Sequence, residues 1–443
     1  MDSISPLDSR YSSKLHDVRS IFSNANFTKY KCFVECEYLK FIISIIRNYT
    51  PHQLSHYNTI IEDIANNIES NSVRETEKIT NYETKTNHDI QALVMYIRDL
   101  VPKEIRELVH FGLTSQDINS PAMILSYRDF NNTVFLIEIE KVLETLQDIG
   151  LENKKTVMLT FTHGQPATPT TFKKQMDVFI NKLGDIVHDL EENYQYKTKM
   201  GGSNGDLTAL RVSYPKIDWE ASMDRFVSSQ LLLTRNRNTT QIDDYSNYYR
   251  LFQIYQRTCV VLINLCQDIW LYCSKNYLKM RNVVGEVGSS AMPHKINPIH
   301  FENAEGNLKL ATDMFESIGK NICINRLQRD LTDSTLLRNV GVACGYMILA
   351  IRNINTGLSR ITLNHHEIKH DLNENSIVII EFIQLIMRSK GIPNGYELCK
   401  QYARGRKQFN FTEFIGFMES NNIPINAEFI EMINLDYVKI FDL

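Results

Sequence analysis

The segment 285–298, GEVGSSAMPHKINP, places two hydroxyl groups near a cation. Ser289 and Ser290 follow a glycine, which gives this part of the chain conformational freedom, and Lys295 brings an ammonium group within reach of them. Asn297-Pro298 is typical of a helix start. A serine is a poor base, but a neighbouring cation and a helix N-terminus make its alkoxide more accessible. The segment therefore has the groups to remove a proton beside a carboxylate, although an ordinary Ser/Gly turn before a helix is the alternative.

Polar groups also gather at two other predicted helix starts. Residues 114–117, TSQD, follow the capping pattern of Ser/Thr with an acid three residues later. Backbone N–H groups and two hydroxyls at a helix start suit a carboxylate, although most such motifs only cap. Residues 333–335 are predicted to begin another helix, flanked by Arg329 and Arg338, and two guanidinium groups suit a phosphate. Pairing of these arginines with nearby aspartates is the structural alternative.

The elements that must position these groups are predicted to be helices. Apolar residues recur at helical spacing over four long segments, at 170–196, 248–277, 299–319 and 334–360. Around 259–273 the second segment is apolar on several faces, as in a helix that lies inside a bundle. Few stretches alternate as strands do. The sequence therefore predicts an all-α fold built on a long central helical bundle.

Three domains are predicted, which a chain of 443 residues can supply with a large core. They are an N-terminal helical domain at 1–103, a central long-helix bundle at 104–359 that carries the polar motifs, and a C-terminal helical domain at 360–443. The polar stretches 201–206 and 234–244 are expected to be loops. Pro393-Asn394-Gly395 is expected to be a turn in the last domain.

Composition limits the class of protein. Lys and Arg number 48 against 52 for Asp and Glu, so the formal net charge is −4, which argues against a nucleic-acid partner or a membrane surface. The most apolar run, 259–265, is too short to span a membrane. The eight cysteines occur singly and form no zinc motif. No signal peptide is evident, so a cytoplasmic protein with free thiols is expected.

The segment 285–298 resembles the signature GSSxMPxKxNP of the fumarase/aspartase superfamily of β-eliminating lyases. His294 occupies a variable position, and histidine there resembles adenylosuccinate lyases, whereas fumarases usually carry glycine. Five other motifs resemble adenylosuccinate lyases in the expected order: SPLDSRY at 5–11, TNHD at 86–89, TSQD at 114–117, THGQPATP at 162–169 and RDLTDST at 329–335. The resemblance extends over most of the chain.

This resemblance implies a reaction, the β-elimination of fumarate from adenylosuccinate, giving AMP, and from the succinylated aminoimidazole carboxamide ribotide SAICAR, giving AICAR, in purine biosynthesis. Such an elimination needs a base, an acid for the leaving nitrogen, and cations or donors that hold the carboxylate. The matching positions imply Ser289 as the base and Lys295 as a stabiliser of the carboxylate. They also imply His163 as the general acid, with Glu302 as the carboxylate that pairs with this histidine.

The resemblance also implies a set of substrate contacts without any metal or cofactor. Lys174 and Lys199 are weaker matches, and His88 is an alternative acid, although an orienting role is favoured for it. The implied substrate-binding residues are Arg10, Tyr11, Asn87, His88, Asp89, Thr114, Ser115, Gln241, Ser290, Asn297, Asn303, Arg329, Ser334, Thr335 and Arg338.

The assembly implied by the resemblance is a homotetramer of three-domain, all-α lyase chains, in which the central bundles form the core and subunits share active sites for a small-molecule nucleotide. Two alternatives remain open, a sister lyase such as argininosuccinate lyase and a non-catalytic structural descendant. The chain departs from close relatives at 201–206, where GGSNGD stands in place of NGAVGN, and at 244–246, where DYS stands in place of PHD. These departures affect the expected contacts near the base-binding edge.

Overall fold

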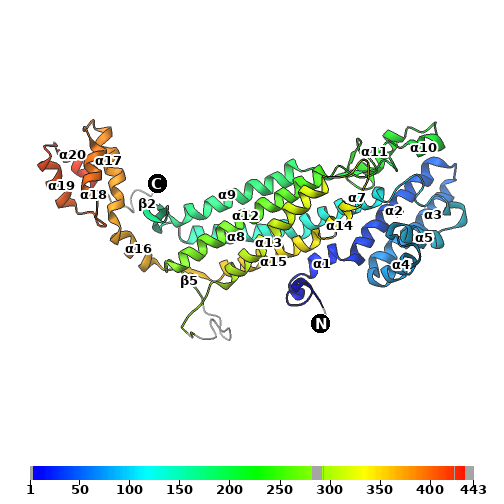
Figure 1. Ribbon diagram of the computed structural model, residues 1–443, viewed down its shortest axis with the longest axis horizontal. Helices are drawn as coiled ribbons and strands as arrows, with labels where there is room; N and C mark the ends of the chain where they lie inside the picture. The colour runs from blue at the N-terminus through cyan, green and yellow to red at the C-terminus, as the bar shows by residue number, and fades with distance from the viewer. Residues whose placement is uncertain (1–2, 282–291, 293, 424, 435–443) are drawn as a thin grey trace. The chain divides into compact units, whose positions relative to one another are not determined.

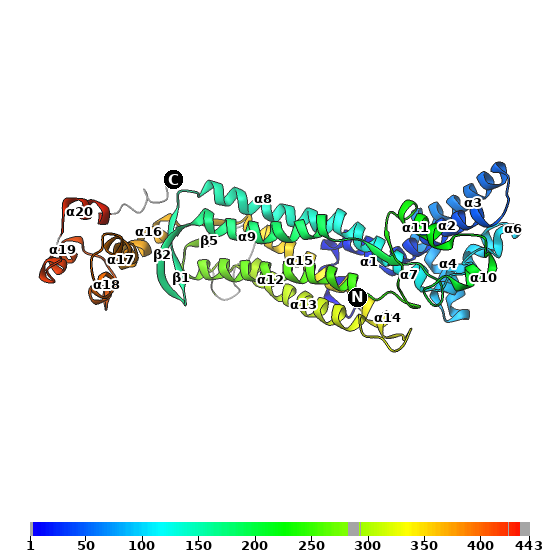
Figure 2. The ribbon, with the colours of Figure 1, turned by 90° about the horizontal axis from the view of Figure 1, so that it is seen from above.

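The computed structural model describes residues 3–281, 292, 294–423 and 425–434 (Figures 1 and 2). Helices make up most of this part of the chain and its strands are short, which confirms the predicted all-α fold. Two compact units are present. The first comprises Met1–Ile139, Asp185–Ile263 and Gly306–Arg352, and the second comprises Glu140–Gly184, Asn264–Glu305 and Asn353–Leu443. The division into three domains stays a prediction.

The N-terminal helices of the first unit lie side by side in both ribbon views (Figures 1 and 2). They surround buried side chains of α2 such as Tyr38, Leu39 and Ile42. Asn87, in a left-handed conformation with φ 50°, ends α4. The elements are η1 (Pro6–Asp8), η2 (Ser12–Lys14), α1 (His16–Phe22), α2 (Asn24–Ile46), α3 (Pro51–Ser70), α4 (Ser72–Thr86), α5 (Asp89–Leu100), α6 (Lys103–Arg106) and α7 (Gln116–Phe130).

The four long helical segments are present close to their predicted positions. They are α9 (Phe172–His188) with the π-helical turn η4 (Asp189–Asn193), α12 (Ser246–Ser274), α13 (Ile299–Ile322), and α14 (Thr332–Leu337) with α15 (Val340–Leu358). The π-helical turn η3 (Asn131–Phe135) leads into a further helix, α8 (Leu136–Glu152). Helices α12 and α13 are adjacent within each unit, because Gln256 donates a hydrogen bond to Glu316 in the first unit and Gln267 donates one to Glu305 in the second.

Three short strand pairs interrupt the helices. The pair β1 (Val157–Thr162) and β2 (Gln165–Thr171) forms an antiparallel hairpin, and β5 (Leu278–Met280) pairs antiparallel with β6 (Ile361–Leu363). The pair β3 (Lys197–Lys199) and β4 (Thr234–Asn236) is parallel. The prediction of a loop over 234–244 was therefore wrong for its first three residues, since a partner strand distant in sequence orders them. The stretch 201–206 forms a loop, as predicted.

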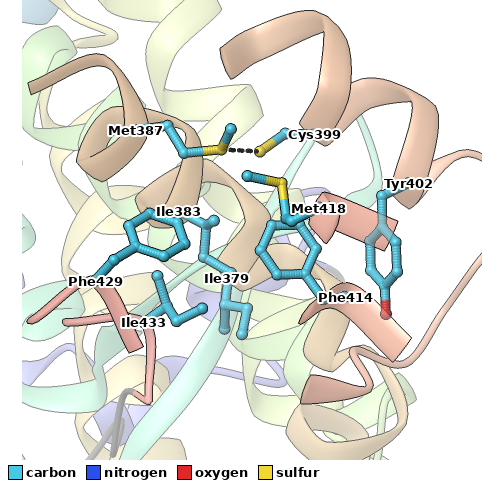
Figure 3. Packing of buried hydrophobic residues seen from close by; sticks show 9 residues of the cluster. All are labelled: Ile379, Ile383, Met387, Cys399, Tyr402, Phe414, Met418, Phe429 and Ile433. Carbon is cyan, nitrogen blue, oxygen red and sulfur yellow. Dashed lines mark hydrogen bonds between the residues drawn. The ribbon is translucent and has the colours of Figure 1, made fainter. Parts of the chain in front are cut away.

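Two short helices, α10 (Thr208–Ser213) and α11 (Trp219–Ser229), complete the first unit. In the second unit the C-terminal helices enclose a small apolar core, in which the Cys399 thiol donates to Met387 Sδ at 3.5 Å (Figure 3). Asn394, with φ 55°, makes the predicted turn before α18. The elements are α16 (His365–Glu374), η5 (Ser376–Ile379), α17 (Ile380–Ser389), α18 (Gly395–Ala403), α19 (Phe411–Ser420) and α20 (Ala427–Ile433).

One helical stretch, Thr332–Leu358, is long and apolar enough by composition to cross a membrane, with a mean hydropathy of 1.4. More than half of its most apolar window, 56%, is buried inside the protein. Ala343, Cys344 and Met347 are fully buried there. A helix in the core of a protein has the same composition, so this stretch fits a core helix.

Candidate active site

The segment predicted to hold the base is described only in its second half. Ser289 and Ser290 lie outside the described residues, whereas Lys295 is described and its side chain is exposed. The helix that follows begins at Ile299, because the Pro298 carbonyl accepts the N–H groups of Phe301 at 3.0 Å and Glu302 at 3.3 Å. Ile299 is the first residue of the predicted segment 299–319, and it directly follows Asn297-Pro298. Lys295 therefore lies four residues before Ile299, on the N-terminal and positive side of α13.

His163 lies at the tip of the β1–β2 hairpin. Thr162 pairs with Gln165, so His163 and Gly164 form the two-residue turn. Their φ values are 53° and 73°, as a type I′ turn requires. The His163 side chain is exposed, and it forms no ion pair or side-chain hydrogen bond with the described residues. The hairpin thus presents an imidazole to solvent at a two-residue turn.

Glu302, in the first turn of α13, has a partner that the sequence did not reveal. The indole Nε1–H of Trp270 on α12 donates to Glu302 Oε1 at 3.0 Å. Among the described residues no ion pair joins Glu302 to His163. The next residue, Asn303, accepts a hydrogen bond at Oδ1 from Asn353 Nδ2 at 2.8 Å. No motif in the sequence indicated this contact between α12 and α13.

The start of α7 brings two predicted binding residues together. Ser115 Oγ lies 3.3 Å from His88 Nε2. His88 caps α5, since its Nδ1 accepts the Gln91 N–H at 3.2 Å. A neutral ring with an accepting Nδ1 carries its proton on Nε2, which then donates to Ser115. His88 is thereby oriented by both of its nitrogens, which fits an orienting role better than that of an acid.

The neighbouring Asp89 has a permanent cationic partner. Lys31 Nζ donates to Asp89 Oδ2 at 2.7 Å. Burial alone would raise the pKa of the Asp89 carboxyl, but the attraction of Lys31 outweighs it and lowers the pKa below its ordinary value. Asp89 is therefore anionic at neutral pH.

The predicted phosphate-binding residues surround a helix start at the expected place, α14. Arg329 Nη1 donates to both oxygens of Asp333, at 2.7 and 2.8 Å, so the structural alternative of an Arg329–aspartate pair is formed. Asp333 is buried and also accepts the Tyr245 hydroxyl at 2.6 Å. Arg338 is exposed and forms no ion pair with the described residues. The Arg329 guanidinium is thus paired with a carboxylate of the chain, whereas the exposed Arg338 guanidinium can bind a ligand.

The remaining predicted residues divide between the two units. The first unit carries Arg10, whose guanidinium lies 5.9 Å from the centre of the Tyr11 ring, and Gln241, which follows the Thr240 hydroxyl that donates to the Gln328 carbonyl at 3.0 Å. It also carries Asn87, His88, Asp89, Thr114, Ser115, Arg329, Ser334, Thr335 and Arg338. The second unit carries His163, Lys295, Asn297, Glu302 and Asn303.

Two buried ionisable residues meet beside the start of α7, namely Asp117 of the TSQD motif and Lys199, which was predicted only as a weaker match. Asp117, whose side chain is fully buried, accepts Lys199 Nζ at 2.7 Å, and Lys199 is fully buried too. Asp117 had been read only as part of a capping pattern, and it does accept the Thr114 N–H at 2.8 Å. No spacing rule pairs residues 82 positions apart.

Comparisons with known proteins give the family. Residues 41–311 match a family profile described as Lyase, and residues 325–438 match one described as Adenylosuccinate lyase C-terminal. The adenylosuccinate lyase of Dictyostelium discoideum is 39% identical over 436 residues, which cover 96% of this chain and 93% of that protein. That of Vibrio cholerae is 34% identical over 420 residues, which cover 92% and 90%.

Two solved structures share the fold. The 3-carboxy-cis,cis-muconate lactonizing enzyme from Pseudomonas putida has a TM-score of 0.75 at 19% identity, covering 96% of this chain and 95% of that one. A fumarate lyase from Mesorhizobium sp. BNC1 has a TM-score of 0.71 at 17% identity, covering 96% of both chains. The likeness at this identity concerns the fold alone, whereas the sequence relatives and both profiles agree on the family. The chain belongs to the adenylosuccinate lyase family and is a carbon–nitrogen lyase.

Proposed function

We propose that this chain eliminates fumarate from adenylosuccinate, leaving AMP, and from SAICAR, leaving AICAR. The observation that carries the proposal is the 39% identity, over nearly the whole chain, to a relative named adenylosuccinate lyase. His294, at the variable position of the signature, also favours this substrate over that of a sister lyase.

The proposed chemistry takes one proton and breaks one carbon–nitrogen bond. Ser289, as its alkoxide, removes the proton from the carbon next to a carboxylate, while Lys295 and Asn297 stabilise the charge that gathers on that carboxylate. The electron pair forms the double bond of fumarate as the C–N bond breaks. His163 gives a proton to the leaving nitrogen. The exposure of His163 on its hairpin supports this role, since an acid must reach the substrate.

Most of the proposed substrate contacts lie in the first unit. Thr114 and Ser115, at the N-terminus of α7, hold a succinyl carboxylate near the positive end of the helix dipole. The contact of Ser115 with His88 supports a pre-arranged site. Arg329 and Arg338 hold the phosphate. Arg329 would then share its guanidinium between Asp333 and the phosphate, since only Nη1 is engaged with the carboxylate.

A shared site in a homotetramer is part of the proposal. Several large apolar side chains on α12 and α13 are exposed in the single chain, including Val260, Leu271 and Leu310. Large apolar side chains exposed on long helices are typical of helices that pack against other subunits.

Burial of six of the eight free cysteines supports a reducing, cytoplasmic location.

The test is a direct assay of the purified protein. Mixing it with adenylosuccinate should change the absorbance of the purine and release fumarate and AMP in equal amounts, and SAICAR should be cleaved in a parallel reaction. Cleavage of argininosuccinate instead would identify a sister lyase. Turnover of none of these substrates by a folded protein would favour a non-catalytic structural descendant.

A further inference from the structure

One buried carboxylate joins the start of α7 to the glycine-rich turn 201–205. Asp117 Oδ2 accepts the Thr114 N–H at 2.8 Å. Its Oδ1 accepts the N–H groups of Gly201 at 2.8 Å and Gly202 at 3.2 Å, in addition to Lys199 Nζ. Asp117 is therefore saturated with donors from two segments that are distant in sequence.

Lys199 binds both Asp117 and the turn, so that Asp117, Lys199 and the turn 201–205 together form a joint. Its ammonium donates to Asp117 and to the Gly202 carbonyl, both at 2.7 Å, and no part of its side chain reaches solvent. Burial lowers the pKa of Lys199, and the attraction of Asp117 opposes this shift without cancelling it. A buried charge pair of this kind is weak evidence of stabilisation, because the attraction between the charges only partly offsets the cost of removing them from water.

The turn fits between its neighbours only because it is built from glycine. A Cβ on Gly201 would lie 2.6 Å from the Gly205 carbonyl oxygen, and one on Gly205 would lie 2.0 Å from the Thr239 carbonyl oxygen. A Cβ on Gly202, whose φ is +75°, would lie 3.1 Å from the Gly112 carbonyl oxygen. The turn is thus in close contact with the segment before α7 on one side and with Thr239 on the other.

The contacts continue from this turn to two more proposed binding residues. Thr239 is followed by Thr240, whose hydroxyl donates to the Gln328 carbonyl at 3.0 Å. In the sequence, Gln241 directly follows Thr240, and Arg329 directly follows Gln328. A continuous path of close contacts within the first unit therefore connects the proposed carboxylate site with the proposed nucleotide contacts.

We infer that Asp117 and Lys199 are positioning residues that set the separation between Thr114-Ser115 and the pair Gln241 and Arg329, so that one substrate molecule spans both. This inference rests on the proposed function. Both side chains are fully buried, so they act through the backbone of the turn and not by touching substrate. The departure from relatives at 201–206 leaves the joint intact, because Asp117 and Lys199 bind main-chain atoms of the turn.

The experiment compares a spanning ligand with its two halves. Lys199→Met removes the ammonium but keeps the Asp117–Thr114 hydrogen bond. It should lower kcat/KM for adenylosuccinate about 10–100-fold, because a small misplacement of binding groups has that effect. AMP and fumarate each contact one side of the joint, so their inhibition constants should change less than about two-fold. The double variant Asp117→Asn/Lys199→Met leaves no uncompensated charge and should show at least the same loss with adenylosuccinate.

A matched control separates positioning from stability. Tyr96→Phe removes another buried hydrogen bond of the first unit, 2.6 Å from Tyr96 Oη to Glu75 Oε2, and should lower Tm without changing kcat/KM. The inference is overturned if Lys199→Met or the double variant lowers Tm but leaves kcat/KM unchanged, as Tyr96→Phe should. It is also overturned if either variant weakens the binding of AMP and fumarate as much as it lowers kcat/KM for adenylosuccinate. Wild-type protein that does not cleave adenylosuccinate would instead overturn the proposed function, and the inference with it.

Discussion

The two units hold some of their candidate groups in different ways. In the first, Asp117 accepts four hydrogen bonds and Asp333 is bound by Arg329 and Tyr245, so binding residues are fixed by buried charges. In the second, His163 is exposed at a hairpin tip and Lys295 is exposed before a helix. We infer from this difference that a chain builds its own binding frame, whereas the proposed acid His163 faces outward.

Physical chemistry favours this division. A buried charge must be paired and hydrogen-bonded, which makes it a rigid part of the frame. A group that transfers a proton must reach the substrate and cannot have its hydrogen bonds permanently occupied by the protein. Outward-facing acids are useful only where another surface closes over them, which agrees with the proposal of shared sites.

The largest effect that tests the contrast between the two units is expected at His163. His163→Ala should lower kcat about 10²–10⁴-fold, the usual contribution of a positioned acid, with Tm unchanged because the side chain is exposed and forms no described hydrogen bond. His366→Ala, at an exposed histidine of α16, serves as the matched control and should leave kcat unchanged. Normal turnover by folded His163→Ala protein would rule out this residue as the acid.

Arg329 and Arg338 allow a paired and an unpaired candidate for phosphate binding to be compared within the first unit. Arg329→Ala should weaken AMP binding by about 1.5–3 kcal/mol, the value of a hydrogen bond to a charged group, and should also lower Tm because Asp333 loses its partner. Arg338→Ala should weaken AMP binding but leave Tm unchanged. Calorimetry with AMP and adenosine is the measurement. Equal losses for the two ligands would contradict a phosphate-binding role.

A smaller effect is expected at a third buried charge pair of the first unit. Glu35 is fully buried and accepts both the backbone N–H of His110, at 2.7 Å, and its ring Nδ1, at 2.8 Å. Burial alone would lower the pKa of His110, but Glu35 outweighs it and raises the pKa above its ordinary 6.5. The pair therefore stabilises the fold fully below pH ~6.5 and less as the pH rises through the folded-state pKa.

His110→Gln should accordingly reduce the free energy of unfolding more at pH 6 than at pH 9, by about 1–3 kcal/mol. Urea unfolding at both pH values measures the difference, and His366→Gln should show none. A loss in His110→Gln that is the same at both pH values would mean that the charge of His110 contributes nothing.

The sequence predicted the elements whose signal is local. Apolar residues at helical spacing indicated α9, α12, α13 and α15 to within a few residues. The β1–β2 hairpin was missed, because its turn uses His163-Gly164 and not a common turn pair. Strand β4 was missed as well, since it is ordered only by pairing with β3 far away in sequence.

The candidate site divides along the same line. Motifs indicated Thr114, Ser115 and His88, and the structure brings Ser115 and His88 together. The partners that fix such residues come from distant segments, so no motif could show that Lys199 binds Asp117 or that Trp270 binds Glu302. The roles of Ser289, His163 and Lys295 stay predictions.

The most direct test of the proposal that subunits share active sites is complementation between two inactive variants. Ser289→Ala and His163→Ala proteins, each inactive alone, are mixed in equal amounts, dissociated mildly and reassembled. If each site takes these two residues from different subunits, random hybrids should recover up to about a quarter of the wild-type activity. Hybrid tetramers confirmed by native mass spectrometry that remain no more active than their parents would contradict the account.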